Sequence, residues 1–112
     1  MIIAIASRNG KTVDTHFGKS NSLYIYNFDE EKNETKFIEH RTIDIDIESK
    51  HQNQKIISEI SDCDVVISLQ HGGKSGIYAK NAGLKLVDDE GSIEEVLEKY
   101  INHVNFMKNI KI

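Results

Sequence analysis

The chain has 112 residues, a formal net charge of −4 with neutral histidines, 38% hydrophobic residues and 29% charged residues. This length suits one domain, and the composition is that of a globular protein rather than a disordered or membrane-embedded one. A single cysteine excludes an intrachain disulfide and a metal site built only from cysteines. The acidic balance argues against a nucleic-acid-binding surface, and no apolar stretch approaches the roughly 20 residues of a membrane helix.

The first part of the chain predicts three strands. Residues 2–6 are continuously apolar, which favours a strand covered on both faces. A polar connection over 7–22 follows, and residues 23–28 are aromatic and β-branched, as is typical of a strand. Residues 35–45 predict a third strand whose later part alternates apolar and acidic side chains, so one of its faces is expected to be wet. The second and third strands therefore form a hairpin.

The remainder alternates helices with strands. Two capping boxes, Ser49 with Gln52 and Ser92 with Glu95, predict helix starts, and Gly83 predicts a helix end. The expected elements are a helix over 50–61, a strand over 64–69, a glycine-rich loop over 70–76, a short helix over 77–82, a strand over 84–87, and a last helix from Ser92 to Val104 with a tail that docks or frays.

This order of elements, β-β-β-α-β-α-β-α, predicts an α/β class with three layers and a mixed five-stranded sheet in one domain spanning 1–112. The first and fourth strands are expected at the centre, because the chain leaves them toward opposite sides of the sheet. Ligands favour the crevice beyond the carboxyl ends of strands at such a switch point. The connection over 7–22, the loop after the third strand and the loop over 70–76 should meet there.

Three histidines, His16, His51 and His71, belong to segments at this edge. Cys63 precedes the fourth strand and so lies at the opposite edge, where it is expected to be a small buried hydrophobe. His16-Phe17-Gly18 has two interpretations: a turn in which Gly18 has a positive φ and Phe17 fills a gap, or an imidazole held over the crevice to bind a metal or a cluster edge.

The loop over 70–76 also leaves alternatives open. It resembles a phosphate-binding loop, but the spacing fails because Ser68 stands where the first glycine of a P-loop would be. A tight turn is one interpretation, and backbone amides at Gly72 and Gly73 that accept a generic anion are the other. His71 is either an exposed loop residue or a second imidazole facing His16.

These segments together are similar to a known family. Residues 15–20 (Thr-His-Phe-Gly-Lys-Ser) follow a short apolar strand and precede Leu-Tyr-Ile-Tyr at 23–26, and residues 64–68, 82–87 and 92–100 continue the likeness. Over residues 1–101 the chain resembles the dinitrogenase iron–molybdenum cofactor biosynthesis family, which includes NifX-type proteins and the C-terminal domain of NifB-type proteins. The resemblance implies a ribonuclease-H-like three-layer fold. It also implies binding or carriage of an iron–sulfur-type cofactor or its precursor, with His16 as a ligand.

The chain departs from that family at two points. Ser20 lies where some cofactor-binding relatives have a cysteine, and the loop after the fourth strand begins Leu-Gln-His-Gly at 69–72, where the family is usually richer in glycine. His71 is therefore expected to supply an imidazole in place of the thiolate. Without thiolate ligands, weak and exchangeable binding follows. The expected cofactor-binding residues are His16, Phe17, Gly18, Gly72 and Gly73, and the expected metal ligands are His16 and His71.

The expected function is non-enzymatic carriage of an iron–sulfur or iron–molybdenum cluster. The expected partners are cluster-assembly or acceptor proteins, in the cytoplasm, for a monomer or weak homodimer that contacts neither nucleic acid nor membrane. A metal-free protein-interaction module is the alternative. A metal-dependent nuclease is a more distant one, because its two cations need carboxylates at the sheet centre and residues 1–6 contain none.

Overall fold

Five strands of the protein form one mixed sheet in the order β4-β3-β1-β5-β6. The computed structural model describes residues 1–46 and 52–109. Its main elements are β1 (Ile2–Ala6), β3 (Ser22–Asp29), β4 (Glu34–Thr42), α1 (Asn53–Glu59), β5 (Val65–Ser68), α2 (Gly73–Asn81), β6 (Lys85–Asp88) and α3 (Ile93–Asn109). The short elements β2 (Thr12–Val13), η1 (Phe17–Lys19) and β7 (Gly91–Ser92) are added to the expected order.

The sheet has the expected switch point at its centre. β1 pairs parallel with β5, and β5 pairs parallel with β6, while β3 runs antiparallel to both β1 and β4. The chain therefore leaves β1 toward the β3–β4 hairpin and leaves β5 toward β6, on opposite sides of the central pair. The predicted α/β class with a mixed five-stranded sheet is confirmed.

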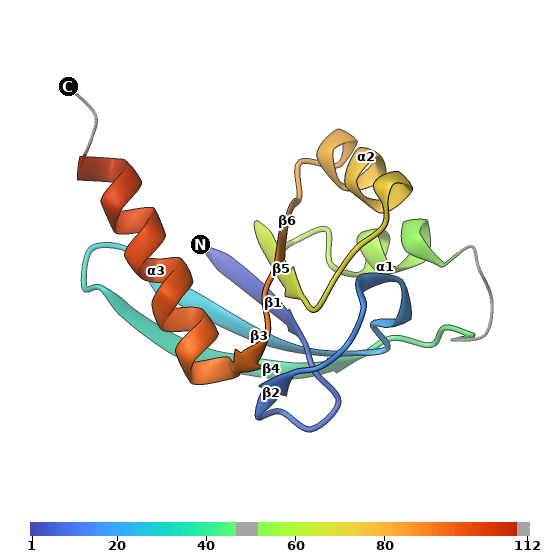
Figure 1. The fold of residues 1–112 in the computed structure, drawn as a ribbon, viewed down its shortest axis with the longest axis horizontal. Coiled ribbons are helices and arrows are strands. Elements are labelled where there is room, and N and C mark those ends of the chain that lie inside the picture. Colours follow the sequence, from blue (N-terminus) through green and yellow to red (C-terminus); the bar gives the residue numbers. More distant parts are fainter. Residues whose placement is uncertain (47–51, 110–112) are drawn as a thin grey trace.

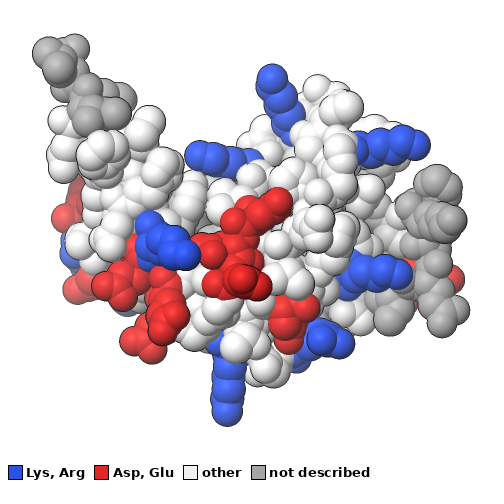
Figure 2. All heavy atoms as spheres, viewed as in Figure 1, with Lys and Arg blue, Asp and Glu red and all other residues white. Residues whose placement is uncertain are grey.

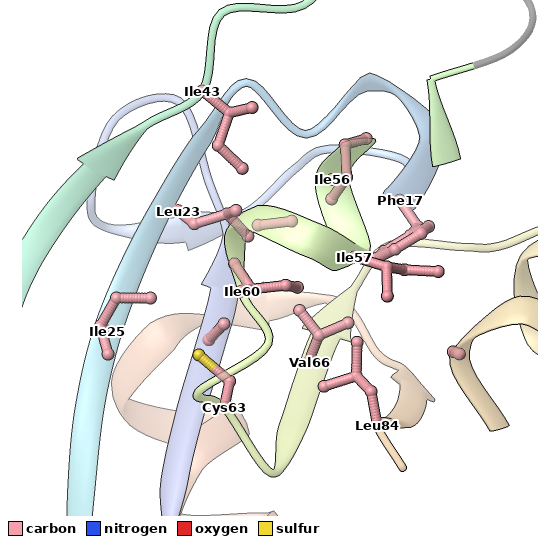
Figure 3. Close-up of a cluster of buried hydrophobic side chains, with 13 residues drawn as sticks. Phe17, Leu23, Ile25, Ile43, Ile56, Ile57, Ile60, Cys63, Val66 and Leu84 are labelled. Atoms are coloured by element: carbon pink, nitrogen blue, oxygen red, sulfur yellow. The ribbon is translucent and has the colours of Figure 1, made fainter. Parts of the chain in front are cut away.

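Helices cover both faces of the sheet (Figure 1). On one face, the isoleucines of α1 and Ala79 of α2 pack on alternate residues of β1, β3 and β5 (Figure 3). On the other face, Ile93, Val96, Leu97 and Tyr100 of α3 pack on the intervening residues of the same strands. Residues of β1 reach both clusters and are almost fully buried, which explains its uninterrupted apolar sequence.

Several boundaries differ from the sequence prediction. β4 ends at Thr42, although Ile43 and Ile45 beyond it still pack on the core while Asp44 is exposed. The predicted alternation thus persists in burial beyond the strand. Ile43 N donates to Asn21 O, the next pair in the register, but Asn21 N donates to Lys19 O of η1, so the ladder does not continue. The predicted start of α1 at Ser49, and His51 with it, lies outside the described residues.

The last two helices are both longer than predicted. α2 begins at Gly73 rather than at residue 77, because Gly72 has an extended backbone that serves as its N-cap. α3 continues beyond Val104 to Asn109. Its last turns are tied to the β3–β4 hairpin, because Asn105 Nδ2 donates to Asn33 Oδ1 at 3.0 Å and Lys108 pairs with Glu30 at 3.0 Å. Of the two alternatives for the tail after Val104, the described residues up to Asn109 therefore show docking.

A two-stranded sheet of β2 and β7 was not expected. Thr12 pairs with Ser92 and Val13 with Gly91, and Ile93 N donates to Lys11 O. Ser92 Oγ accepts from Glu95 N at 3.1 Å, so the predicted cap of the last helix forms at the point where this small sheet ends. The sheet ties the long connection after β1 to the start of α3.

No helix within the described part of the chain is both long and apolar enough to cross a bilayer.

Gly10 and Gly83 have the same left-handed backbone conformation but different surroundings. Comparing them distinguishes the cost of backbone strain from the cost of steric contact. Gly10 and Gly83 have φ of +76° and +77°, and a Cβ at Gly10 would lie 2.8 Å from the Tyr24 ring, whereas one at Gly83 meets no atom within 4 Å. We expect Gly83→Ala to lower the free energy of unfolding by about 1–2 kcal/mol, from backbone strain alone. Gly10→Ala should cost about 2–4 kcal/mol, because the ring must also move. Urea unfolding of both variants measures this, and equal losses would contradict the contact with Tyr24.

Candidate functional site

Two backbone hydrogen bonds join the loops that follow β1 and β5. Leu69 N donates to Thr15 O at 3.0 Å, and Phe17 N donates to Gln70 O at 2.8 Å. The segment containing His16 therefore lies directly beside the residue that precedes His71, at the carboxyl end of the central strand pair. This is the edge at which the switch-point argument places a ligand crevice.

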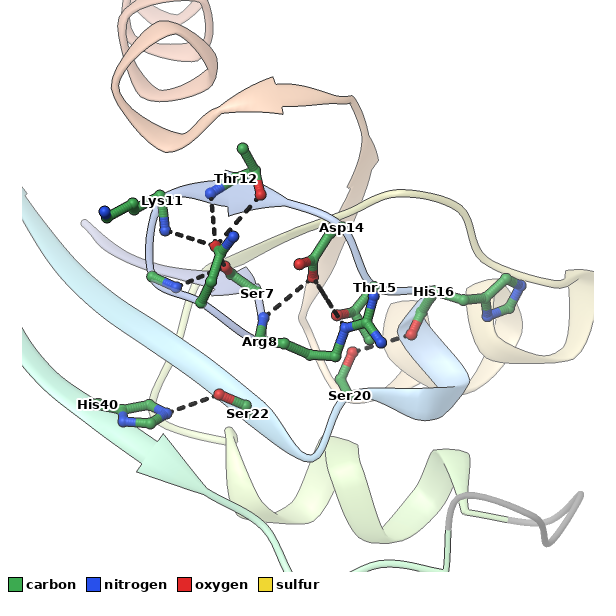
Figure 4. Close-up of polar contacts among 12 residues, drawn as sticks. Ser7, Arg8, Lys11, Thr12, Asp14, Thr15, His16, Ser20, Ser22 and His40 are labelled. Carbon is green, nitrogen blue, oxygen red and sulfur yellow. Dashed lines mark hydrogen bonds and ion pairs between the residues drawn. The ribbon is translucent and has the colours of Figure 1, made fainter.

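His16 is exposed, and contacts of the residues that follow it fix its backbone. Phe17 is fully buried in the α1–α2 side of the core, and it fixes the backbone on which the imidazole stands. His16 caps the η1 turn, with Nδ1 accepting from Gly18 N at 3.2 Å, and Ser20 Oγ donates to His16 O at 3.2 Å. Its ring points away from the polar contacts of the preceding loop (Figure 4).

One sequence interpretation of this motif needs correction. Gly18 was expected at a positive φ, but the positive-φ glycines among the described residues are at positions 10, 83 and 91. Gly18 instead lies inside the η1 turn, and a Cβ there would lie 3.3 Å from Asn53 Oδ1 of α1. A side chain at this position would therefore require the Asn53 side chain to shift by a few tenths of an ångström. The prediction that Phe17 fills a gap is confirmed.

The loop before His16 is stabilised by its own side chains. Asn9 Oδ1 accepts from Lys11 N at 2.8 Å and from Thr12 N at 3.0 Å, and Ser7 Oγ accepts from Gly10 N at 3.0 Å (Figure 4). Asp14 accepts from Arg8 N and from the Thr15 hydroxyl. Such side-chain bonds to backbone N–H groups give an irregular segment a defined shape.

His71 is oriented by a carboxylate. Its Nδ1 lies 2.5 Å from Asp88 Oδ1 at the end of β6, and the histidine side chain is 27% exposed. The same ring lines a groove of about 450 Å³ between α2 and β6, together with Gly76, Lys80 and residues 83–86. Because a carboxylate accepts but does not donate, Nδ1 is the ring nitrogen that donates in this contact.

Gly72 and Gly73 begin α2 rather than lying within a free loop. Gly72 is its N-cap and Gly73 its first residue, and a Cβ on either would meet nothing within 4 Å. Neither has a positive φ. The start of α2 is therefore open on the side of these two glycines, while the glycine-rich loop predicted over 70–76 is limited to its first three residues.

The structure brings the backbones of the two histidine segments together and gives their rings separate partners. Gly18 N lies against the imidazole of His16, whereas Asp88 and Gly76 lie against that of His71. Over residues 1–46 and 52–109, no group of three or more His, Cys, Asp and Glu side chains could hold a metal ion.

Cys63 lies where the sequence places it, before β5 and away from the histidine segments. It is 6% exposed and belongs to the α1–α2 side of the core (Figure 3). Burial, assisted by the neighbouring Asp62 carboxylate, raises the pKa of the Cys63 thiol to about 12. A thiol that stays protonated is not a metal ligand, because ligation requires the thiolate.

Charge is divided between the two sides of the sheet. α2 carries Lys74 and Lys80 and no acidic residue, whereas Glu94 and Glu95 begin α3. Figure 2 shows acidic side chains gathered over the start of α3 and lysines and arginines projecting singly on the α2 side. The loop with His71 leads directly into α2, which carries no acidic residue of its own.

Sequence reasoning missed the role of Asp88. Nothing local in the sequence links Asp88 to His71, which lies 17 residues earlier. The register of β5 with β6, which pairs Ser68 with Asp88, could have indicated it. A strand end directly beside the loop that follows the neighbouring strand is a general signal for such a contact.

The fold and the edge just described define a three-layer α/β domain with loop histidines beyond the carboxyl ends of its central strands. The family model described as "dinitrogenase iron-molybdenum cofactor" matches residues 1–103. The chain therefore belongs to that family, which links it to iron–molybdenum cofactor biosynthesis.

Individual relatives are more distant. The chain is 27% identical over 95 residues to the FeMo cofactor biosynthesis protein NifB of Chlorobaculum tepidum, covering 85% of this chain and 22% of that protein. The chain thus spans about a fifth of this relative's length. Similar solved structures are PH0822, at 20% identity and a TM-score of 0.73 with 92% of each chain covered, and the apo orange protein of Desulfovibrio gigas, at 16% identity and 0.65 with 91% of this chain and 88% of that one covered. Both show the fold.

The state of Cys63 gives a direct test of the thiolate argument. With a pKa of about 12 and a buried sulfur, native Cys63 should react with an aromatic disulfide reagent at about pH 8 roughly 10³-fold more slowly than in urea-unfolded protein. The sign follows from the raised pKa, since the thiolate forms only as the pH approaches 12. Reaction of the native protein at the unfolded rate would contradict it and would admit Cys63 as a ligand.

Proposed function

We propose that this protein binds an iron–sulfur or iron–molybdenum type metallocofactor, or its precursor, and passes it on during cofactor assembly without catalysing a reaction. The observation that carries the proposal is the exposed imidazole of His16, fixed by buried Phe17 and by the bond from Phe17 N to Gln70 O. Family membership supplies the class of cargo.

The donor chemistry supports weak, reversible binding. Imidazole ligates iron, but the softer thiolate is the donor that iron–sulfur clusters prefer. The buried Cys63 thiol does not supply the thiolate. A cluster held through His16, with His71 on the adjoining loop, would exchange readily, which suits a carrier rather than a protein with a permanent cluster.

The charge and the open space at α2 support binding of an anionic cluster beside the histidine loops. Sulfide-bridged clusters are anionic overall, and α2 offers Lys74 and Lys80 without a carboxylate. Gly72 and Gly73 leave open space at the start of α2, where backbone N–H groups favour negative charge. The proposal therefore includes Phe17, Gly18, Gly72 and Gly73 as the frame around the cargo, with His16 and His71 as its ligands.

A transfer step also needs a protein contact. Three apolar side chains near the histidine loops are exposed: Leu69 at 40%, Ile77 at 63% and Tyr78 at 38%. Exposed apolar residues that adjoin a polar edge are typical of interaction surfaces. The proposed partners are cluster-assembly or acceptor proteins of the cytoplasm, met by a monomer or weak homodimer.

His16→Ala tests the proposal. The protein is loaded anaerobically with isolated iron–molybdenum cofactor or a [4Fe–4S] cluster, passed over a desalting column, and assayed for retained iron and visible absorbance. We expect His16→Ala to bind at least about tenfold more weakly, which corresponds to roughly 1.4 kcal/mol. His103→Ala, which removes another exposed imidazole on α3, should retain the wild-type amount. Equal retention in all three proteins would refute the role of His16.

A further inference from the structure

The sheet ends in two edge strands, β4 and β6, which differ in how they are protected. β4 is long, but its register against β3 shifts midway, and it carries exposed Lys36 and Glu39. Bulges and charged side chains are devices that protect an open edge from further pairing. β6 is in unbroken register with β5, and its two central residues, Leu86 and Val87, are apolar and only half-buried. β6 is therefore the edge better suited to accept another strand.

The backbone of β6 presents hydrogen-bonding groups to the open edge at two positions. Lys85 N and Asp89 N donate to carbonyl oxygens on the β5 side, at 3.1 Å and 2.9 Å. Successive peptide groups of a strand point to opposite sides. The N–H and C=O groups of Leu86 and Asp88 therefore point away from β5, toward the open edge.

The residues on either side of this stretch already have backbone partners. Leu84 N donates to a carbonyl of α2 at 2.9 Å, and Glu90 N donates to the Asp89 carboxylate at 2.8 Å. An added strand thus finds its hydrogen-bonding positions at 86 and 88. A second β6 running antiparallel uses all four of these groups in one register, in which Leu86 of each copy lies opposite Asp88 of the other.

We propose that two copies of this protein pair through β6, antiparallel about a two-fold axis beside Val87, and so join their sheets. In this register Lys85 of each copy lies opposite Asp89 of the other, and the two Val87 side chains meet at the axis. These three residues share the α3 face, since Val87 packs with the α3 cluster and the Lys85 ammonium lies 5.9 Å from the centre of the Tyr100 ring. Opposite charges placed directly across a strand pair stabilise it. The edge is therefore complementary to itself.

Both faces of the sheet have room beside β6. On the α3 face, a groove of about 380 Å³ lies between the strand and the helix, with Val87, Tyr100 and His103 in its lining. On the other face, the groove of about 450 Å³ separates β6 from α2. The helices therefore stop short of this edge and leave it accessible. Lys99 holds the Asp89 carboxylate there at 3.2 Å.

The contact is small and adjoins the candidate site. A strand of four residues offers few hydrogen bonds, so the dimer is weak and reversible. Asp88 belongs to both regions, because its backbone faces the open edge while its carboxylate contacts His71. Pairing through β6 thus gives the weak homodimer of the proposed function a defined interface, and it needs no cargo to form.

The first experiment measures self-association of the wild-type protein without cargo. Sedimentation equilibrium across about 10 µM to 1 mM protein should show a reversible monomer–dimer equilibrium. Amide hydrogen exchange over the same range should show Leu86 and Asp88 N–H becoming at least about tenfold slower to exchange as the dimer forms. The amides of β4 should keep their monomer rates. A monomer throughout this range, or new protection in β4 instead, would overturn the proposal.

The second experiment tests the register by charge reversal. Lys85→Glu places acidic side chains opposite each other at both ends of the pairing, and Asp89→Lys places lysines there. Each variant alone should dimerise at least about tenfold more weakly than wild type. An equimolar mixture of the two should dimerise with near wild-type affinity, because each opposed pair then has opposite charges. Lys36→Glu on β4 is the matched control and should retain the wild-type Kd.

The outcomes are distinct from those of cofactor carriage. Unchanged dimerisation of Lys85→Glu, equal weakening by Lys36→Glu, or no recovery in a mixture of variants with wild-type circular dichroism would each overturn the pairing. Exchange protection at Leu86 and Asp88 decides independently of either variant. A protein that pairs through β6 but retains no cluster would refute carriage alone, and a monomer that retains cluster would refute the pairing alone.

Discussion

The arrangement of the site depends on one short stretch of backbone pairing between the loops after β1 and β5. Leu69 N bonds to Thr15 O and Phe17 N bonds to Gln70 O, which extends the contact of the central strands beyond the ends of both. The stretch is anchored by Phe17, whose side chain is fully buried. Because a buried aromatic and two backbone bonds fix the same few atoms, His16 stands on a defined platform although its own ring is exposed.

The rest of the first loop supports that platform by local bonds. Ser7, Thr15 and Ser20 are buried polar residues, and each has a hydroxyl that bonds within the segment. Across the described residues, no buried side-chain nitrogen or oxygen lacks a partner. Buried polar groups cost free energy unless they are paired. The hydrogen bonds of these hydroxyl groups therefore both compensate their burial and hold the loop in one shape. A preformed loop reduces the ordering cost of binding a ligand beside it.

The two faces of the sheet have different roles: α3 closes one face, and the other carries the helices beside the candidate site. Helix α3 has the stronger separation of apolar and polar residues, and its isoleucine, valine, leucine and tyrosine side chains close one face of the sheet. Helices α1 and α2 are short and lie beside the histidine loops. Asn53 of α1 approaches Gly18, and Gly76 of α2 approaches His71, so each short helix begins against one half of the candidate site.

How much could be predicted differs between elements for physical reasons. β1 was predicted to the residue, because a run of buried residues has no competing interpretation at that length. The start of α2 was placed four residues late, since glycines at 72, 73 and 76 suggest a loop when tertiary contacts are unknown. The β2–β7 pair was missed because two-residue strands have no periodicity. The sequence predicted that loops bearing histidines meet at this edge of the sheet. It did not predict that Asp88 is the partner of His71.

The sequence alone determined the layers, the central strand pair, the burial of Cys63 and the edge at which the loops with His16 and His71 lie. These follow from apolar periodicity and from the order of strands and helices, which are properties of the chain itself. Only the tertiary structure decided which groups face the two imidazoles. Gly18 lies two residues from His16, and Asp88 lies 17 residues from His71, and in both cases the bond depends on ångström-scale placement of a turn or a strand end. The hydrogen-bond partner of each ring is therefore a property of the fold.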